Sequence, residues 1–372
     1  MKKATVLGLV LLLCGTTLFA EDAKVMPARM GRFYLAPTFA FANGEFEEDG
    51  SRKSYDSGEG ALKLFNLGLA LEYGIIDWIT GAVQWAPGWN VWSDVDQSMA
   101  TMNPAFDESV NVKGFNDIFV GAKMQIIGPS ALVQSETLRL AFGPGMKIPL
   151  PAADYEEQAK NVASNDPATG ANTDYHVFGF GLRSYFDFII NKYFYINVYN
   201  EFLYYPVKGD MKKAGLLPYA IASAIDQFKA FGFDYGDVTY DYDLTFELEP
   251  AFSYTTESRI ILGAGLPVNY KFTPGVKYDL TRPDASGFLT AISSNYGATS
   301  PQYIAAATAV GIANSIQDSD PTHYLSVKPY ASAFFVGWPL PMEFKLQYGL
   351  PLWGKNQRIN NTITLQIRAY FR

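Results

Sequence analysis

Cysteine and histidine are scarce in this chain, and long apolar runs are missing. There is one cysteine, Cys14, and there are two histidines among 372 residues. These residue types are the usual ligands of transition metals, so we expect no such metal site and no cofactor. A hard-cation site at Asp94 and Asp96, or at Asp318 and Asp320, is the alternative. Beyond the N-terminus no segment offers the roughly 18 uninterrupted apolar residues of a transmembrane helix. No basic cluster stands out among 29 basic and 37 acidic residues, so nucleic acid is not expected as a partner.

The first 20 residues predict a cleaved export signal. Lys2 and Lys3 form a positive start, residues 4–13 are apolar, and Ala20 offers a small residue before an acidic pair. Cleavage there leaves residues 21–372 as a mature chain without cysteine or disulfides. A lipid anchor on Cys14 is the alternative, although Leu13 stands where a lipobox normally has a small residue.

Strict alternation of apolar and polar residues is the strongest pattern, and residues 240–254 show it best. One face of this segment is apolar or aromatic: Tyr240, Tyr242, Leu244, Phe246, Leu248, Pro250, Phe252 and Tyr254. The other face includes the carboxylates of Asp241, Asp243, Glu247 and Glu249. Inside a soluble sheet each of these would cost several kcal/mol unless it were paired. A transmembrane β-barrel instead turns the apolar face to lipid and keeps the acidic face in a hydrated lumen.

Twelve candidate strands predict a single transmembrane antiparallel β-barrel over residues 21–372, an all-β fold with helical segments only in its extracellular loops. They lie near residues 31–42, 61–74, 78–87, 114–127, 136–150, 174–189, 192–207, 239–255, 258–272, 323–336, 341–352 and 359–372. Short and long connections alternate, as periplasmic turns and outer loops do in bacterial outer-membrane barrels. We therefore expect a barrel in the outer membrane, surrounded by its lipid. The last strand resembles the one that the barrel-assembly machinery recognises, although Arg372 follows its terminal aromatic residue, Phe371.

The inward positions of the expected strands carry charges of both signs. We predict that the lumen is lined by Lys123, Arg139, Lys147, Arg183, Asp241, Asp243, Glu247, Glu249, Lys345 and Arg368. Basic residues on several strands should pair with the acidic column of residues 241–249, because an unpaired column would repel itself. Two interpretations stay open, a structural network and a selectivity lining for a charged solute.

Two outer loops contain apolar helical patterns that a plain porin does not need. Residues 214–231 place apolar side chains at helical spacing, and residues 301–316 follow an N-cap, Ser300, with Pro301 at the first helical position. We predict that the loops bound a pocket for a hydrophobic small molecule, lined by Leu217, Ile221, Ile225, Phe228, Phe288, Leu289, Ile304, Ile312 and Ile316. The alternative is that these helices pack on each other as a lid or plug.

Three stretches, residues 25–29, 67–78 and 114–123, resemble FadL-type transporters of long-chain fatty acids and aromatic hydrocarbons. The sequence pattern of their hairpins is also similar to that of spirochaete outer-membrane proteins. The resemblance implies a monomeric barrel that captures hydrophobic molecules with extracellular helical loops and releases them laterally through its wall. It also implies fourteen strands, the alternative count, and an N-terminal hatch inside the barrel. Only residues 21–30 precede the first expected strand here, so both features depart from the sequence pattern.

The function that we expect is a channel for hydrophobic small molecules such as long-chain fatty acids. A general diffusion porin for small polar solutes and a structural or adhesive surface protein are the alternatives. An enzyme is not expected. Asp174 and His176 resemble the Asp-x-His pair of omptin proteases, but this spacing is frequent by chance.

Overall fold

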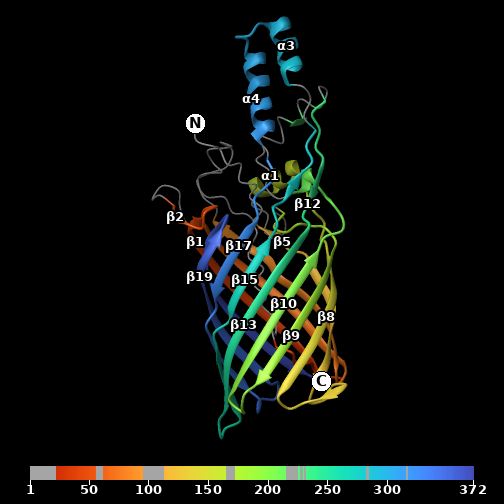
Figure 1. Cartoon of the computed structure of the whole chain (residues 1–372), viewed down its shortest axis with the longest axis vertical. Coiled ribbons are helices and arrows are strands. Elements are labelled where there is room, and N and C mark those ends of the chain that lie inside the picture. The colour runs from red at the N-terminus through yellow and green to blue at the C-terminus, as the bar shows by residue number, and fades with distance from the viewer. Residues whose placement is uncertain are drawn as a thin grey trace.

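A computed structural model describes residues 22–55, 62–94, 113–164, 172–214, 225–226, 229, 232–281, 285–315 and 317–372. The expected export signal, residues 1–20, lies outside this part of the chain. Figure 1 shows strands slanting around one closed wall, with the C-terminus at one end and two helices projecting beyond the other. We call the end with the helices the outer end, because the long loops gather there.

The wall is a ring of 12 antiparallel strand positions, all within the described residues, and it closes because β20 pairs with β1. Ten positions hold one strand each: β1 (Gly31–Phe46), β3 (Leu62–Ile76), β4 (Ile79–Asp94), β6 (Ile118–Gly128), β8 (Leu138–Ile148), β9 (Gly179–Ile189), β10 (Phe194–Tyr204), β13 (Tyr242–Thr255), β19 (Met342–Lys355) and β20 (Gln357–Phe371). The predicted twelve-strand barrel is confirmed, and the alternative count of fourteen is wrong.

The other two positions are each filled by two short strands in succession. They are β14 (Ile260–Gly265) with β15 (Val268–Thr273), and β17 (Thr322–Val327) with β18 (Tyr330–Phe335). The register is unchanged across the first interruption, because β13 pairs Leu248 with Val268 and then Ala251 with Gly265. Pro267 and Pro329 lie in the two gaps, and proline cannot donate to a ladder of hydrogen bonds. The interruptions therefore follow from the sequence.

Short strands and helices lie outside the 12 positions of the ring. They are β2 (Arg52–Ser54), β5 (Gly114–Phe115), β7 (Val133–Gln134), a separate sheet of β11 (Gly209–Asp210), β12 (Asp237–Thr239) and β16 (Lys277–Tyr278), the 3-10 helix η1 (Met211–Lys213), and the helices α1 (Tyr155–Ser164), α3 (Ala285–Tyr296) and α4 (Pro301–Ser315). The helix predicted at residues 301–316 is confirmed as α4, whereas α1 was not predicted. No helix among the described residues is long and apolar enough to cross a membrane.

The alternation predicted for β13 is present through most of the strand. Leu244, Phe246 and Leu248 are 39–43% exposed on the outside of the ring, whereas Thr245 and Glu247 are buried on its inside. The pattern fails at Tyr240, which was expected to face lipid but is buried among the outer loops. Asp241 has a φ of 49°, so the chain turns just before the strand begins and the alternation cannot extend back to Tyr240.

Candidate functional site

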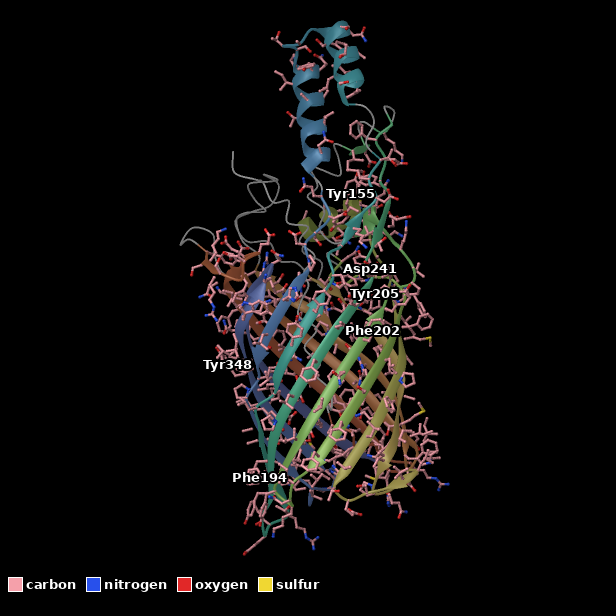
Figure 2. The ribbon with its side chains drawn as sticks, in the orientation of Figure 1. Tyr155, Phe194, Phe202, Tyr205, Asp241 and Tyr348 are labelled. Carbon is pink, nitrogen blue, oxygen red and sulfur yellow. The ribbon has the colours of Figure 1, made fainter. Side chains whose placement is uncertain are left out.

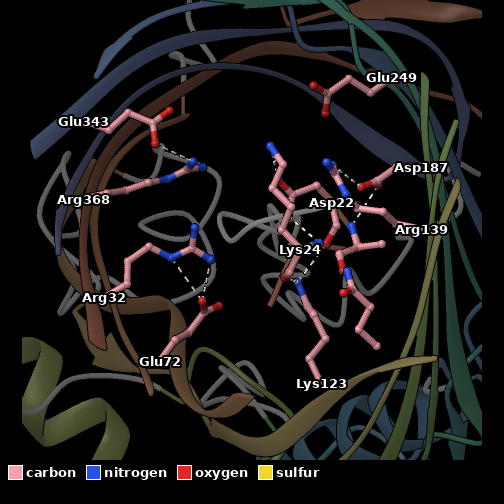
Figure 3. Close-up of polar contacts among 12 residues, drawn as sticks. Asp22, Lys24, Arg32, Glu72, Lys123, Arg139, Asp187, Glu249, Glu343 and Arg368 are labelled. Atoms are coloured by element: carbon pink, nitrogen blue, oxygen red, sulfur yellow. Dashed lines mark hydrogen bonds and ion pairs between the residues drawn. The ribbon is translucent and has the colours of Figure 1, made fainter. Parts of the chain in front are cut away.

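The N-terminal segment, residues 22–30, enters the lumen of the ring, where Figure 3 shows Asp22 and Lys24 between opposite walls. Ala23 is completely buried and packs with Ala141, Tyr185 and Tyr199. Its backbone N–H donates to Asp187 Oδ1 at 2.8 Å, and its carbonyl accepts from Gln125 Nε2 at 2.7 Å. The segment is therefore held by side chains that the wall strands point inward.

Further contacts continue along the segment towards β1. Lys123 Nζ donates to the carbonyl of Asp22 at 2.9 Å, and the Met26 N–H donates to Thr80 Oγ1 at 2.7 Å. The segment leaves the lumen beside Gly74, where an added Cβ would lie 2.0 Å from the carbonyl oxygen of Pro27. Only glycine allows this close approach. The interior of the barrel is thus occupied at the end opposite the outer loops.

Sequence reasoning did not assign residues 22–30 to the lumen. The segment has no periodicity, and its hydrogen bonds to the wall run through its backbone, which every residue type shares. The sequence signal that could have pointed to it is the glycine at position 74 next to a polar inward face. The predicted absence of a large hatch is compatible with this finding, because the inserted piece is short.

Ion pairs line the lumen around the segment. The Arg32 and Glu72 side chains meet at 2.5 Å, and Arg368 Nη1 lies 3.0 Å from Glu343 Oε2 (Figure 3). Further pairs in the described lumen are Lys24 with Asp22, Arg139 with Asp187, Arg183 with Glu201 and Lys328 with Glu247. The structure therefore places the predicted lining residues Arg139, Arg183 and Arg368 in ion pairs, and Lys123 donates to the carbonyl oxygens of Asp22 and Lys24. A network so closely paired has little net charge left for selecting one sign of ion.

The acidic column on β13 is satisfied mostly by hydroxyl and amide donors. Asp243 accepts from Thr273 Oγ1 at 2.7 Å and from the Tyr205 hydroxyl at 2.9 Å. Further down the strand, Asn269 Nδ2 donates to Glu247 at 3.1 Å and the Tyr330 hydroxyl donates to Glu249 at 2.5 Å. Such contacts lower the cost of burying a carboxylate without an opposite charge.

The column also has basic partners. Lys328 forms an ion pair with Glu247 at 3.8 Å, and Lys345 lies over the Tyr330 ring at 3.7 Å. Asp241 differs from the prediction, since it pairs with the exposed Lys277 of β16 at 2.7 Å rather than lining the lumen. Its positive φ directs the chain out of the strand at this point. Figure 2 labels Asp241 near the outer end of the wall.

An apolar cluster, which we call the outer cap, lies among the loops at the outer end. Its buried members are Tyr175, Val177, Tyr205, Met211, Ala214, Ile225, Phe233, Val238, Tyr240, Val276, Leu280, Phe288, Ala306 and Val310. Tyr175 stacks on Tyr240 with ring centroids 4.1 Å apart and meets Tyr205 edge-on at 5.0 Å. Since Tyr175 and Tyr205 also contact Asp243 of the wall, the cap is joined directly to the mouth of the barrel.

The predicted pocket residues have different fates. Ile225 and Phe288 are brought together in the outer cap, and Leu289 packs against it. Ile304 is 57% exposed, contrary to the prediction, because it lies on the face of α4 opposite to Ala306 and Val310, which are buried in the cap. Ile312 belongs to α4, but its side chain is outside the description. Leu217, Ile221, Phe228 and Ile316, and with them most of the helix predicted at residues 214–231, lie outside the described residues.

Comparisons with known proteins bear on the fold. No protein-family model matches the sequence, and a search of curated proteins finds no match. The COG4313 outer membrane channel from Pseudomonas putida F1 superposes with a TM-score of 0.57 at 10% identity, covering 95% of this chain and 100% of that one. At this identity the likeness shows the fold alone.

Two further solved structures match more loosely. A Pseudomonas aeruginosa FadL homologue has a TM-score of 0.33 at 10% identity and covers 96% of this chain and 95% of its own. The CymD monoaromatic hydrocarbon channel has a TM-score of 0.35 at 10% identity, with coverages of 93% and 88%. Both are of the type that the sequence resembles, but scores this low carry no argument about function. The ring, its lipid-facing belt and the first match together identify an outer-membrane β-barrel.

Proposed function

We propose that this barrel is a channel that takes up hydrophobic small molecules such as long-chain fatty acids across the outer membrane. The observation that carries the proposal is the outer cap, an apolar cluster outside the lipid belt that includes Ile225 and Phe288. Each methylene of an acyl chain gains about 0.8 kcal/mol on leaving water, so an acyl chain that takes the place of packing contacts within the cap would be bound strongly. A polar mouth could not provide this energy.

The lumen supports this function better than that of a general porin. A porin needs a water-filled path, whereas here residues 22–30 occupy the inner part of the lumen, where Ala23 donates its backbone N–H to Asp187 of the wall. The polar lining does favour the porin as the second candidate, because small polar solutes could pass if the N-terminal segment moved. Conductance in a planar bilayer separates the two, since a porin conducts ions without any substrate.

A weakened line in the wall offers a route for lateral release. Leu266 N–H donates to Pro250 at 3.1 Å, Lys328 N–H to Pro267 at 2.8 Å, and Tyr348 N–H to Pro329 at 3.0 Å. Each proline lacks the N–H that would return the second bond of its pair. Three neighbouring strand pairs thus each lack one backbone hydrogen bond at the same height in the wall. We propose that hydrophobic cargo leaves the lumen there.

The test is uptake of a labelled long-chain fatty acid by cells that lack their own transporter. A variant carrying both Ile225→Asp and Phe288→Asp places charges in the cap, and uptake should fall to the background. Ile304→Asp is the matched control, because that side chain is already exposed on α4. Normal uptake by the double variant, with the barrel correctly inserted, would refute capture by the cap.

A further inference from the structure

A buried histidine lies where the outer cap meets the barrel wall. His176 belongs to the loop between β8 and β9, and its side chain is 4% exposed. Its neighbours Tyr175 and Val177 are both members of the outer cap. A change at His176 is therefore transmitted directly to the cluster that covers the mouth.

The histidine is fixed by contacts to two other chain segments. Its backbone N–H donates to Asp117 Oδ2 at 3.0 Å, and its Nδ1 lies 3.1 Å from both Asp117 Oδ1 and the carbonyl oxygen of Leu150. Nδ1 faces two acceptors, so it carries the hydrogen in the neutral ring. Nε2 has no hydrogen-bond partner among the described residues and is the atom that gains or loses the proton.

The charges that face His176 are unbalanced when the ring is neutral. Asp117 lies against it from the segment between β5 and β6, Asp174 from its own loop, and Lys147 from β8. Lys147 Nζ is 2.5 Å from Asp174 and 4.0 Å from Asp117, so a single cation serves two carboxylates. Behind them, Tyr175 and Tyr205 donate to Asp243 of β13, which adds negative charge.

We propose that His176 is a pH-dependent latch, which strengthens the contact between the outer cap and the barrel mouth when the imidazole is protonated and weakens that contact when the imidazole is neutral. Protonation supplies the second cation that the two buried aspartates need. Loss of that proton leaves an unpaired negative charge between the cap and the wall, which favours separation and hydration of this contact.

The direction of the effect follows from linkage. Burial lowers the pKa of the His176 imidazole, but the hydrogen bond to Asp117 and the charges of Asp117 and Asp174 outweigh it and hold the pKa above its usual value. In the open cap the ring is solvated and returns towards the ordinary pKa of about 6.5. The latch is thus complete below that pH and is lost as the pH rises through the raised value. Between the pKa of the ring in the open cap and its raised pKa in the closed cap, the ratio of open to closed cap changes by at most about tenfold per pH unit.

Nuclear magnetic resonance can follow this titration directly, because the chain has only two histidines. The ring signals of the intact barrel in detergent micelles are assigned with His323→Gln and titrated from acid to alkaline pH. We expect the His176 signal to titrate above the usual histidine range. Titration at or below the ordinary value would overturn the proposal.

Cap opening needs a separate measurement. Spin labels on cysteines introduced at Asn295 on α3 and Ser54 on β2, both exposed, report the distance between the cap and the wall. Residues 21–372 contain no other cysteine. The distance distribution should widen with pH along the His176 titration. His176→Gln should give the wide distribution at every pH, whereas His323→Gln should behave like the parent. A distribution that ignores pH, or is unchanged by His176→Gln, would refute the latch.

Discussion

The two obstructions along the barrel axis are built from opposite kinds of contact. Residues 22–30 are held in the lumen by hydrogen bonds to side chains such as Asp187, Gln125 and Thr80. The outer cap is held by packed aromatic and aliphatic side chains around Tyr175 and Phe288. Each hydrogen bond contributes only about 0.5–1.5 kcal/mol net, because water can replace it. Exposing apolar surface costs about 25 cal/mol per Å², so the cap should be the stronger closure unless an apolar ligand replaces its contacts.

The largest effect should come from emptying a position in the cap. Phe288→Ala removes a buried ring that meets Phe233 edge-on at 6.1 Å, and such truncations cost about 3–5 kcal/mol. Hydrogen exchange of the α3 and α4 amides should accelerate accordingly. Ile304→Ala serves as control, since an exposed side chain contributes within about 0.5 kcal/mol. Equal acceleration in the two variants would mean that the cap is not held by its apolar core.

The next effect separates the lipid face of the wall from its lumen face. Leu248→Arg puts a charge on the exposed apolar belt and should destabilise the barrel by about 2–4 kcal/mol if it lies near the membrane midplane. Thr245→Arg points into the lumen, where Glu247 follows two residues along the same face, and should cost less. Urea unfolding in lipid vesicles gives both values. A lumen variant as costly as the lipid variant would contradict the assigned faces.

A smaller effect is expected when the N-terminal segment is loosened. Asp187→Ala together with Gln125→Ala removes both hydrogen bonds to Ala23, a loss of about 2 kcal/mol or roughly thirtyfold in the released fraction. Trypsin should then cleave after Lys24 or Arg29 faster by a similar factor, because cleavage tracks the open population.

The control for this experiment lies on the same strand. Ser184 of β9 faces outward, where its hydroxyl accepts a hydrogen bond from Asn200 at 3.3 Å on the exposed side. Ser184→Ala should leave the cleavage rate unchanged. If the double variant is also cleaved at the parental rate, the segment is held by contacts other than those to Ala23.

Most of the wall was predictable from sequence, because the period of two is repeated in every strand and lipid enforces it. Leu244, Phe246 and Leu248 show why: any slip would turn charges into hydrocarbon. The inserted N-terminal segment was not predictable, since its contacts use backbone groups. The direction of α3 and α4 was not predictable either, because their sequences contain no charged residue to mark a solvent face. Alternation also misassigned Tyr240 and Asp241, where a single positive φ ends the strand.

The smallest expected effect concerns the three prolines that weaken the wall between β13 and β19, namely Pro250, Pro267 and Pro329. Pro267→Ala restores an N–H opposite the Lys328 carbonyl, which already accepts from Gln347 Nε2 at 3.3 Å. A new ladder bond would raise the cost of parting these strands by about 1 kcal/mol and slow release roughly fivefold. Binding at the cap should stay the same, so uptake falls while affinity does not.

The control is Pro144→Ala on β8, which lies away from these three prolines in the ring and should leave uptake unchanged. Slower uptake in the Pro144→Ala variant alone would place the exit elsewhere in the wall. Parental uptake in both variants would argue that cargo passes straight through the lumen. The cargo must then displace the N-terminal segment.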